Sequence, residues 1–129
     1  MTRILLDTNV VIRYFRGDEP FAKSIETADM IVVHPVVYAE YMNGLDPKTA
    51  NGKLMRRHFE EFLDAPPVAL ASVSTATSVF YSKIYRHLKS CGQMIPQNDI
   101  WLAATALENG YQIATHDEHF SLIPMLQLL

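Results

Sequence analysis

The stretch Arg3-Ile4-Leu5-Leu6-Asp7-Thr8-Asn9-Val10-Val11 changes its pattern halfway along, and this change predicts the fold. Its first half is a short apolar run, which is typical of a strand that is covered on both faces in a parallel sheet. From Thr8 or Asn9, either of which can cap a helix, apolar residues recur at helical spacing until Gly17. A strand that passes directly into a helix is the first half of a β-α-β unit.

The same alternation of strand and helix patterns continues along the chain. Further strands are predicted at 30–33, 68–71 and 111–115, with a weak fifth at 126–128. Helices are predicted at 18–27, 35–44, 47–63, 74–90 and 98–110, the last of them capped by Asn98. The inward side chains of the two long helices are expected to be Leu54, His58, Phe59, Phe62 and Leu63, and then Val79, Phe80, Ile84, Tyr85 and Leu88. This order predicts a three-layer α/β sandwich with a parallel sheet of four to five strands between helices.

Length and composition agree with one folded domain over residues 1–129. Hydrophobic residues make up 49% of the chain and charged residues 19%, which is typical of a globular protein with a substantial core. The single cysteine, Cys91, has no intramolecular disulfide partner, so nothing requires an oxidising compartment. The apolar run at the start is too short for a signal peptide or a membrane span. We therefore expect a cytoplasmic protein without a membrane partner.

The net charge of −3 is distributed unevenly. All 11 Lys and Arg residues lie at or before Lys89, and the basic clusters are Arg13/Arg16, Lys53/Arg56/Arg57 and Lys83/Arg86/Lys89. A basic rim around an acidic crevice would suit a substrate with a phosphate backbone. Ordinary solvated helix faces explain each cluster equally well, so both interpretations remain open.

Four carboxylates, Asp7, Glu40, Asp99 and Asp117, carry the functional argument. Each lies where an apolar strand or helix face meets a polar loop. In an open parallel sheet, the carboxyl ends of the strands meet at one crevice, so these acids are expected to converge. Two carboxylates ~4 Å apart repel by about 4 kcal/mol at an effective dielectric constant of 20. Either a shared proton or a divalent cation must relieve that repulsion, and oxygen ligands favour Mg²⁺ or Mn²⁺. Metal-dependent phosphate-ester chemistry is therefore the leading interpretation.

Each acid alone also has an ordinary structural explanation. Asp7 and Asp99 lie at helix starts, where acids are favoured, and Asp117 is suited to capping a last short helix. Glu40 lies in the middle of a helix, where glutamate commonly faces solvent, although its apolar neighbours indicate a partly buried position. Since Thr8 or Asn9 can supply the helix cap, Asp7 is left free to face the crevice. Four separate explanations would not account for all four acids lying at one edge of the sheet.

Other chemistries have weaker support. The pair His116 and His119 has no further cysteine or histidine at zinc-finger spacing, which argues against a zinc site. Cys91 lacks the neighbours of an activated nucleophile. The chain contains neither of the glycine-rich loops that bind nucleotide phosphates.

Four segments in order resemble the successive motifs of PIN domains, in particular those of VapC-type toxins from prokaryotic toxin–antitoxin pairs. The segments are Leu6-Asp7-Thr8-Asn9-Val10, Ala39-Glu40-Tyr41-Met42-Asn43-Gly44, Pro96-Gln97-Asn98-Asp99-Ile100-Trp101-Leu102-Ala103-Ala104 and Ala114-Thr115-His116-Asp117-Glu118-His119-Phe120. Any one of these motifs is weak. Their order and spacing cover nearly the whole chain, which makes the resemblance specific.

The resemblance implies a Mg²⁺- or Mn²⁺-dependent endoribonuclease. It implies that Asp7, Glu40, Asp99 and Asp117 are the catalytic and metal-binding residues, with Thr8, Asn9, Asn98 and Thr115 as supporting polar residues. In the family the fourth acid is sometimes asparagine or lies at a shifted position, so the resemblance implies the role of Asp117 less strictly than those of the other three acids. The implied partners are an RNA substrate, a cognate antitoxin and a second copy of the chain.

Two alternatives remain from the sequence. One is a catalytically silent PIN-like module that only binds RNA or an antitoxin, and metal-dependent cleavage of an RNA oligomer would separate it from a nuclease. The other is a phosphatase of the haloacid dehalogenase type, which also begins with a strand and an Asp-x-Asp motif. In this chain Asn9 stands at the second acid of that motif, and there is no room for a cap domain. A receiver domain fits less well, because the strand at 68–71 has no acid and no lysine follows Lys89.

Overall fold

The computed structural model describes residues 1–129 and has one sheet of five strands in which all neighbouring strands are parallel. The strand order is β3-β2-β1-β4-β5. The strands are β1 (Arg3–Leu6), β2 (Met30–Val33), β3 (Val68–Leu70), β4 (Gln112–Ala114) and β5 (Gln127–Leu128). The parallel sheet predicted from the sequence, with its short fifth strand, is confirmed.

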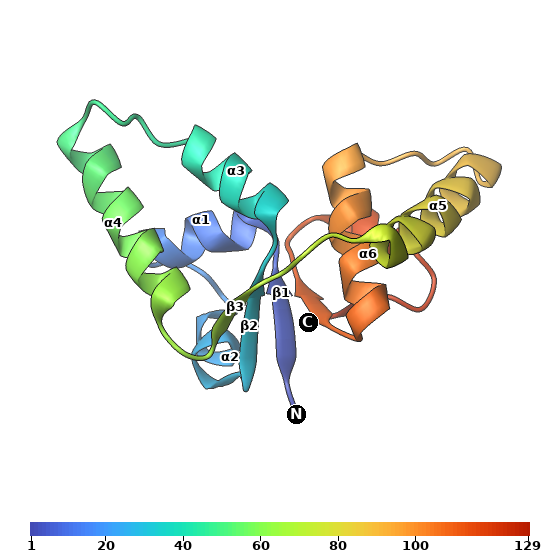
Figure 1. The fold of residues 1–129 in the computed structure, drawn as a ribbon, viewed down its shortest axis with the longest axis horizontal. Coiled ribbons are helices and arrows are strands. Elements are labelled where there is room, and N and C mark those ends of the chain that lie inside the picture. Colours follow the sequence, from blue (N-terminus) through green and yellow to red (C-terminus); the bar gives the residue numbers. More distant parts are fainter.

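Helices cover both faces of this sheet. The connections between β1, β2 and β3 contain α1 (Thr8–Arg16), α2 (Ala22–Thr27), α3 (Pro35–Asn43) and α4 (Ala50–Asp64). The connection from β3 to β4 contains α5 (Thr75–Ser90) and α6 (Gln97–Asn109), and a short 3-10 helix, η1 (Glu118–Leu122), leads to β5. Figure 1 shows α1, α3 and α4 on one side of the sheet and α5 and α6 on the other. This is the expected three-layer arrangement.

The direction of winding reverses between β1 and β4, and this reversal determines where a site can form. From β1 the chain moves outward to β2 and then to the edge strand β3. It then crosses to the other face and returns to the sheet at β4, directly beside β1 (Figure 1). Because crossover connections are right-handed, the connections after β1 and after β4 leave on opposite faces. A crevice therefore opens beyond the carboxyl ends of these two strands.

The core is built from the strands and the inward helix faces. Leu5, Val33 and Ile113 lie in adjacent strands and are completely buried. On the helices, the largest fully buried side chain is that of Phe59, and on η1 it is that of Phe120. None of the helices is both long enough and apolar enough to cross a membrane.

Four predicted helix starts are wrong by a few residues. The second helix, α2, begins at Ala22 rather than at residue 18. Asp7 is itself the cap of α1, because its backbone is extended and its carboxylate accepts a hydrogen bond from the Thr8 amide. The helix that contains Asn98 begins one residue earlier, after Pro96, whose fixed φ of −55° precedes the first turn. Likewise, α4 begins at Ala50 rather than at residue 47, since Thr49 caps it by accepting from the Gly52 amide.

Some side chains that were expected to face inward are exposed. On α4, Phe59 is buried as predicted, but Leu54 and His58 are exposed. On α5, Val79 and Tyr85 are 50% and 40% exposed, although Ile84 and Leu88 on the same helix are buried. Both are outer helices, and α5 packs mainly against α6, so only a narrow stripe of each is covered.

Candidate active site

Asp7 lies at the base of the crevice between β1 and β4. It directly follows β1, and only 6% of its surface is exposed. One carboxylate oxygen, Oδ1, accepts from the Thr8 amide at 2.8 Å. The other, Oδ2, accepts from the Thr115 hydroxyl at 2.7 Å and from the side-chain amide (Nδ2) of Asn9 at 3.3 Å. Asp7 can therefore cap α1 and still lie in the crevice. Its Oδ1 caps the helix, while its Oδ2 is held by Thr115, the residue that follows β4.

The other three acids come from separate segments around Asp7. Glu40 lies on α3, and it is exposed rather than partly buried as expected. Its Oε1 accepts from the Thr8 hydroxyl at 2.8 Å, which links α3 to the start of α1. Asp99 lies in the first turn of α6 and is partly buried. Asp117 follows β4 and caps η1 by accepting from the His119 amide at 3.2 Å.

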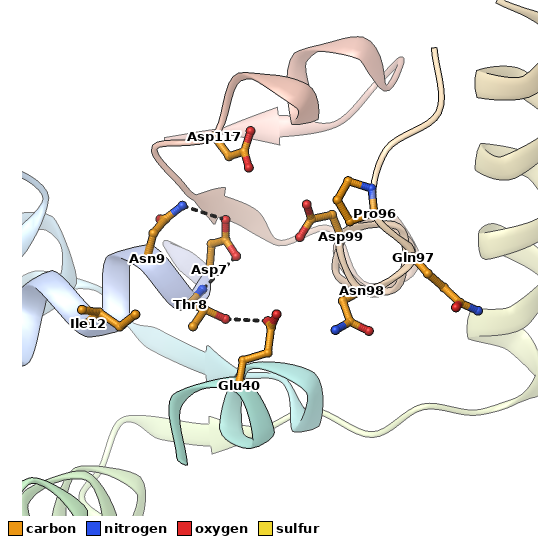
Figure 2. A pocket seen from close by; sticks show the side chains of 10 residues that line it. All are labelled: Asp7, Thr8, Asn9, Ile12, Glu40, Pro96, Gln97, Asn98, Asp99 and Asp117. Carbon is orange, nitrogen blue, oxygen red and sulfur yellow. Dashed lines mark hydrogen bonds between the residues drawn. The ribbon is translucent and has the colours of Figure 1, made fainter. Parts of the chain in front are cut away.

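All four acids line one open cleft of about 610 Å³. Figure 2 shows the carboxylates of Asp7, Asp99 and Asp117 facing a shared space, with Glu40 on its α3 side. No lysine or arginine lines the cleft, and only one lining residue is hydrophobic. The ten lining residues are Asp7, Thr8, Asn9, Ile12, Glu40, Pro96, Gln97, Asn98, Asp99 and Asp117. The structure thus brings the four predicted acids together, along with Thr8, Asn9 and Asn98, while Thr115 supports Asp7 from below.

The electrostatics of the cleft agree with mutual repulsion between the acids. The pKa of Asp99 is raised to about 6, mainly by burial and in addition by the negative charges of Asp7 and Glu40. Burial also raises the pKa of Asp7, as does the charge of Glu40, although hydrogen bonds from Thr115 and Thr8 oppose this. Raised pKa values at two neighbouring carboxyl groups indicate that the protein does not fully compensate their negative charges.

The donor set fits a divalent metal ion. The four carboxylates offer the oxygen ligands that Mg²⁺ and Mn²⁺ accept, and no lysine or arginine in the cleft competes for them. Three ligand atoms, from Asp99, Asp117 and His119, lie within 4.8 Å of one another.

The sequence argument missed one member of this group, His119. Its Nε2 contacts Asp117 Oδ1 and lies 4.0 Å from Asp99 Oδ2. The spacing Asp117-x-His119 within a short turn was the available signal, because such a turn brings two side chains to one side. In the sequence, His119 is considered only as a zinc partner of His116, but the two imidazoles contact different acids, Asp117 and Glu19 respectively.

His116 anchors the β4–η1 loop to the α1–α2 loop. Its Nε2 lies 2.6 Å from Oε1 of Glu19, whose side chain is fully buried. The imidazole also stacks on Phe21, with the ring centroids 5.0 Å apart. These contacts fix the loop that carries Thr115 and Asp117 into the cleft.

The basic clusters do not line the acidic cleft. Arg13 and Arg16 both pair with Asp18 at the end of α1. On α4, Arg56 pairs with Glu60 at 2.8 Å, and Arg57 lies 4.0 Å from Glu61. The arginines of these two clusters are therefore largely neutralised by neighbours. In the third cluster, Lys83, Arg86 and Lys89 are exposed on α5 without a carboxylate partner.

Fold and site together define an α/β protein with an acidic cleft at the switch point of a parallel sheet. The family model for the PIN domain matches residues 4–125, so this chain belongs to the PIN domain family. This membership excludes the haloacid dehalogenase alternative.

Individual relatives agree with this assignment. Ribonuclease VapC1 of Methanocaldococcus jannaschii is 26% identical over 120 residues, which cover 92% of this chain and 79% of that protein. A chain in the structure of VapBC-1 from nontypeable Haemophilus influenzae is 26% identical, with a TM-score of 0.84 over 99% of this chain and 97% of that one. A chain in the structure of VapBC2 from Rickettsia felis, bound to a promoter DNA fragment, has the same TM-score at 21% identity and covers 99% and 98%. This last likeness concerns the fold alone.

Proposed function

We propose that this protein is a Mg²⁺- or Mn²⁺-dependent endoribonuclease that hydrolyses phosphodiester bonds in RNA, and that it is the toxin of a VapBC-type pair. The observation that carries the proposal is the convergence of Asp7, Glu40, Asp99 and Asp117 from four separate segments on one polar cleft. Support from relatives comes from the 26% identity to ribonuclease VapC1.

In this proposal the four acids hold one or two divalent ions. Held by these residues, an ion would supply a water of lowered pKa and would offset negative charge on the scissile phosphate. Asp7 is the central ligand, because three hydrogen-bond donors fix its carboxylate before any ligand arrives. Thr8 orients Glu40 in the same way, and below about pH 6 Asp99 would have to lose a proton before it could hold the cation. The open shape of the cleft allows a long polymer to pass across it.

An antitoxin is the proposed regulatory partner. A second groove, of about 420 Å³, adjoins the acidic cleft and shares Ile12 and Glu40 with it. More than half of its lining residues are hydrophobic, among them Phe15, Leu45 and Met55. An apolar segment of the antitoxin would bind in this groove, and a basic side chain next to it would pair with the acids of the cleft.

We further propose a homodimer that forms through the outer face of α5. Val79 and Tyr85 are large apolar side chains exposed to solvent on that face, next to Ser82. Apolar side chains that gather on the surface commonly mark an interaction site.

The test of the catalytic proposal is RNA cleavage by protein that has been freed of metal and then reloaded. We expect internal cleavage of an RNA oligomer with Mg²⁺ or Mn²⁺, none after chelation, and none by Asp7→Asn with either ion. The exposed, unpaired Asp64 on α4 offers a matched control, so Asp64→Asn should cleave as wild type does. If purified wild-type protein binds RNA but leaves it intact with both ions, the catalytically silent module is the correct interpretation.

A further inference from the structure

A histidine lies beside two of the acids of the cleft, Asp99 and Asp117. The Nε2 atom of His119 contacts Asp117 Oδ1 and lies 4.0 Å from Asp99 Oδ2. The three side chains are 32%, 33% and 16% exposed, so a small ion can reach all of them from solvent. None of the other four histidines approaches these acids: His116 is paired with Glu19, and His34 is buried at the start of α3.

The local fold holds His119 in this place. Asp117 caps η1 and accepts from the His119 amide, so the two side chains leave the same turn together. The next residue, Phe120, is completely buried, which anchors that turn to the core. Three residues before His119, the imidazole of His116 contacts Glu19 and stacks on Phe21, which fixes the other end of the loop. The imidazole is therefore held close to the acids before any ligand binds.

The distances between the three side chains also allow them to share one ion. One ligand atom from each of Asp99, Asp117 and His119 lies within 4.8 Å of the other two. Ligands on opposite sides of one ion with bonds of 2.0–2.2 Å are about 4.2 Å apart, so small side-chain rotations close the site. A set of two carboxylates and one imidazole differs from the all-oxygen sets that Mg²⁺ prefers. Imidazole is a good ligand for first-row transition ions and a poor one for Mg²⁺.

We propose that His119 Nε2 binds the metal ion together with Asp99 and Asp117, and that this ligand makes the site selective for transition ions such as Mn²⁺ over Mg²⁺. The inference rests on the metal site of the proposed function and adds to it a nitrogen ligand and a metal preference. In the opposite case, His119 is only a hydrogen-bond partner that orients Asp117 and never contacts the ion.

Metal binding can be measured directly, without reference to catalysis. Titration calorimetry on metal-free protein would give the dissociation constants of Mn²⁺ and Mg²⁺ for wild type and for His119→Gln, which keeps a polar side chain of similar length. We expect the Mn²⁺ constant to rise about tenfold or more and the Mg²⁺ constant to change by less than about threefold. The exposed His58 on α4 supplies the control, and His58→Gln should leave both constants unchanged. Equal changes for the two ions would overturn the selectivity.

Pulsed electron paramagnetic resonance of the Mn²⁺-loaded protein provides the second readout. A directly bound imidazole gives ¹⁴N modulation in wild type and in His58→Gln, and this signal should be lost in His119→Gln. Bound Mn²⁺ without ¹⁴N modulation in wild type would overturn the inference while leaving the nuclease proposal intact if RNA is still cleaved. Failure of both ions to bind wild type would overturn both proposals. Melting curves of the two variants should match that of wild type in the metal-free state, because both side chains are partly or largely exposed.

Discussion

At the scale of single residues, Asp7 caps a helix and also has the position of a ligand in the metal site that we propose, two roles that are alternatives in the sequence. A carboxylate has two oxygens, so one caps α1 while the other accepts from Thr115 and Asn9. Asparagine is as good a helix cap as aspartate, and it keeps the shape of the side chain. It lacks the charge that is needed to bind a cation. The two tasks of this residue can therefore be separated by one substitution.

We expect Asp7→Asn to abolish metal-dependent RNA cleavage without unfolding the protein. In the absence of metal, its melting temperature should equal or exceed that of wild type, because a charge repelled by Glu40 has been removed. Thermal melting with chelator and an RNA cleavage assay with Mn²⁺ measure the two effects. Cleavage at the wild-type rate would show that Asp7 is a structural cap and no more.

Asp99 predicts the pH dependence of the metal site. Its pKa is about 6 in the folded, metal-free protein, above the ordinary value of 3.8. A cation must displace the bound proton, so metal affinity should fall by about tenfold per pH unit below pH 6 for one displaced proton. Isothermal titrations of Mn²⁺ between pH 5 and pH 8 measure this slope. An affinity that is constant over this range would contradict the role of Asp99 as a ligand.

The same raised pKa affects stability with the opposite sign. Between pH 4 and pH 6 the folded state binds more protons than the unfolded state at Asp99, so its contribution to stability is lost as pH rises. Asp99→Asn should therefore raise the stability of the metal-free protein by on the order of 2 kcal/mol at neutral pH, and by little at pH 4. Burial lowers the pKa of His34 to about 4, so the contribution of His34 to stability grows as pH rises. This contribution is the same in wild type and in Asp99→Asn. The difference between their denaturation curves isolates Asp99.

At the scale of elements, the sequence predicted the strands closely and the helix faces less well. The apolar runs Ile4–Leu6 and Ile31–Val33 are buried on both sides, and nothing but a central strand explains them. On α5, the helical spacing of apolar residues predicted that both Ile84 and Tyr85 face inward, but only Ile84 is buried. Spacing does not say how many neighbours a helix has, and α5 packs mainly against α6. The approach of His119 to Asp99, at the start of α6, likewise depends on tertiary structure, which a local sequence pattern does not contain.

The exposed face of α5 leads to a prediction about assembly. If this face forms the dimer, the double substitution Val79→Glu with Tyr85→Glu should give a monomer, because charges would replace the apolar contact. Light scattering coupled to gel filtration would measure a mass near 14.6 kDa for the variant and about twice that for wild type. Lys89→Glu, an exposed change on the same helix, should stay dimeric. A monomeric wild-type protein, or a variant that remains dimeric, would refute this interface.

At the scale of the whole molecule, the site is a consequence of topology. The chain joins β1 to β4 as sheet neighbours although they are separated by about a hundred residues, and Thr115 thereby donates to Asp7. The acids can therefore repel one another only in the folded chain, and a cation that binds there stabilises only the folded state.

At a hundredfold excess over its Kd, such an ion adds about 2.7 kcal/mol to the free energy of unfolding. For a chain of this size we expect the melting temperature to rise by roughly 10 °C with Mn²⁺. A melting curve unmoved by millimolar Mn²⁺ would argue strongly against the site.

The whole molecule also predicts how the nuclease is controlled. A free endoribonuclease damages the cell that makes it, so expression of this chain alone should slow growth, and co-expression of the protein from the neighbouring reading frame should restore it. Asp7→Asn should be harmless at equal expression, since it removes the central carboxylate of the cleft.

Met55→Glu should separate toxicity from control, because Met55 lines the apolar groove and does not line the acidic cleft. We expect this variant to slow growth as wild type does while the partner no longer restores growth. Full rescue of Met55→Glu would show that the partner binds elsewhere, and normal growth with abundant wild-type protein would contradict the toxin assignment.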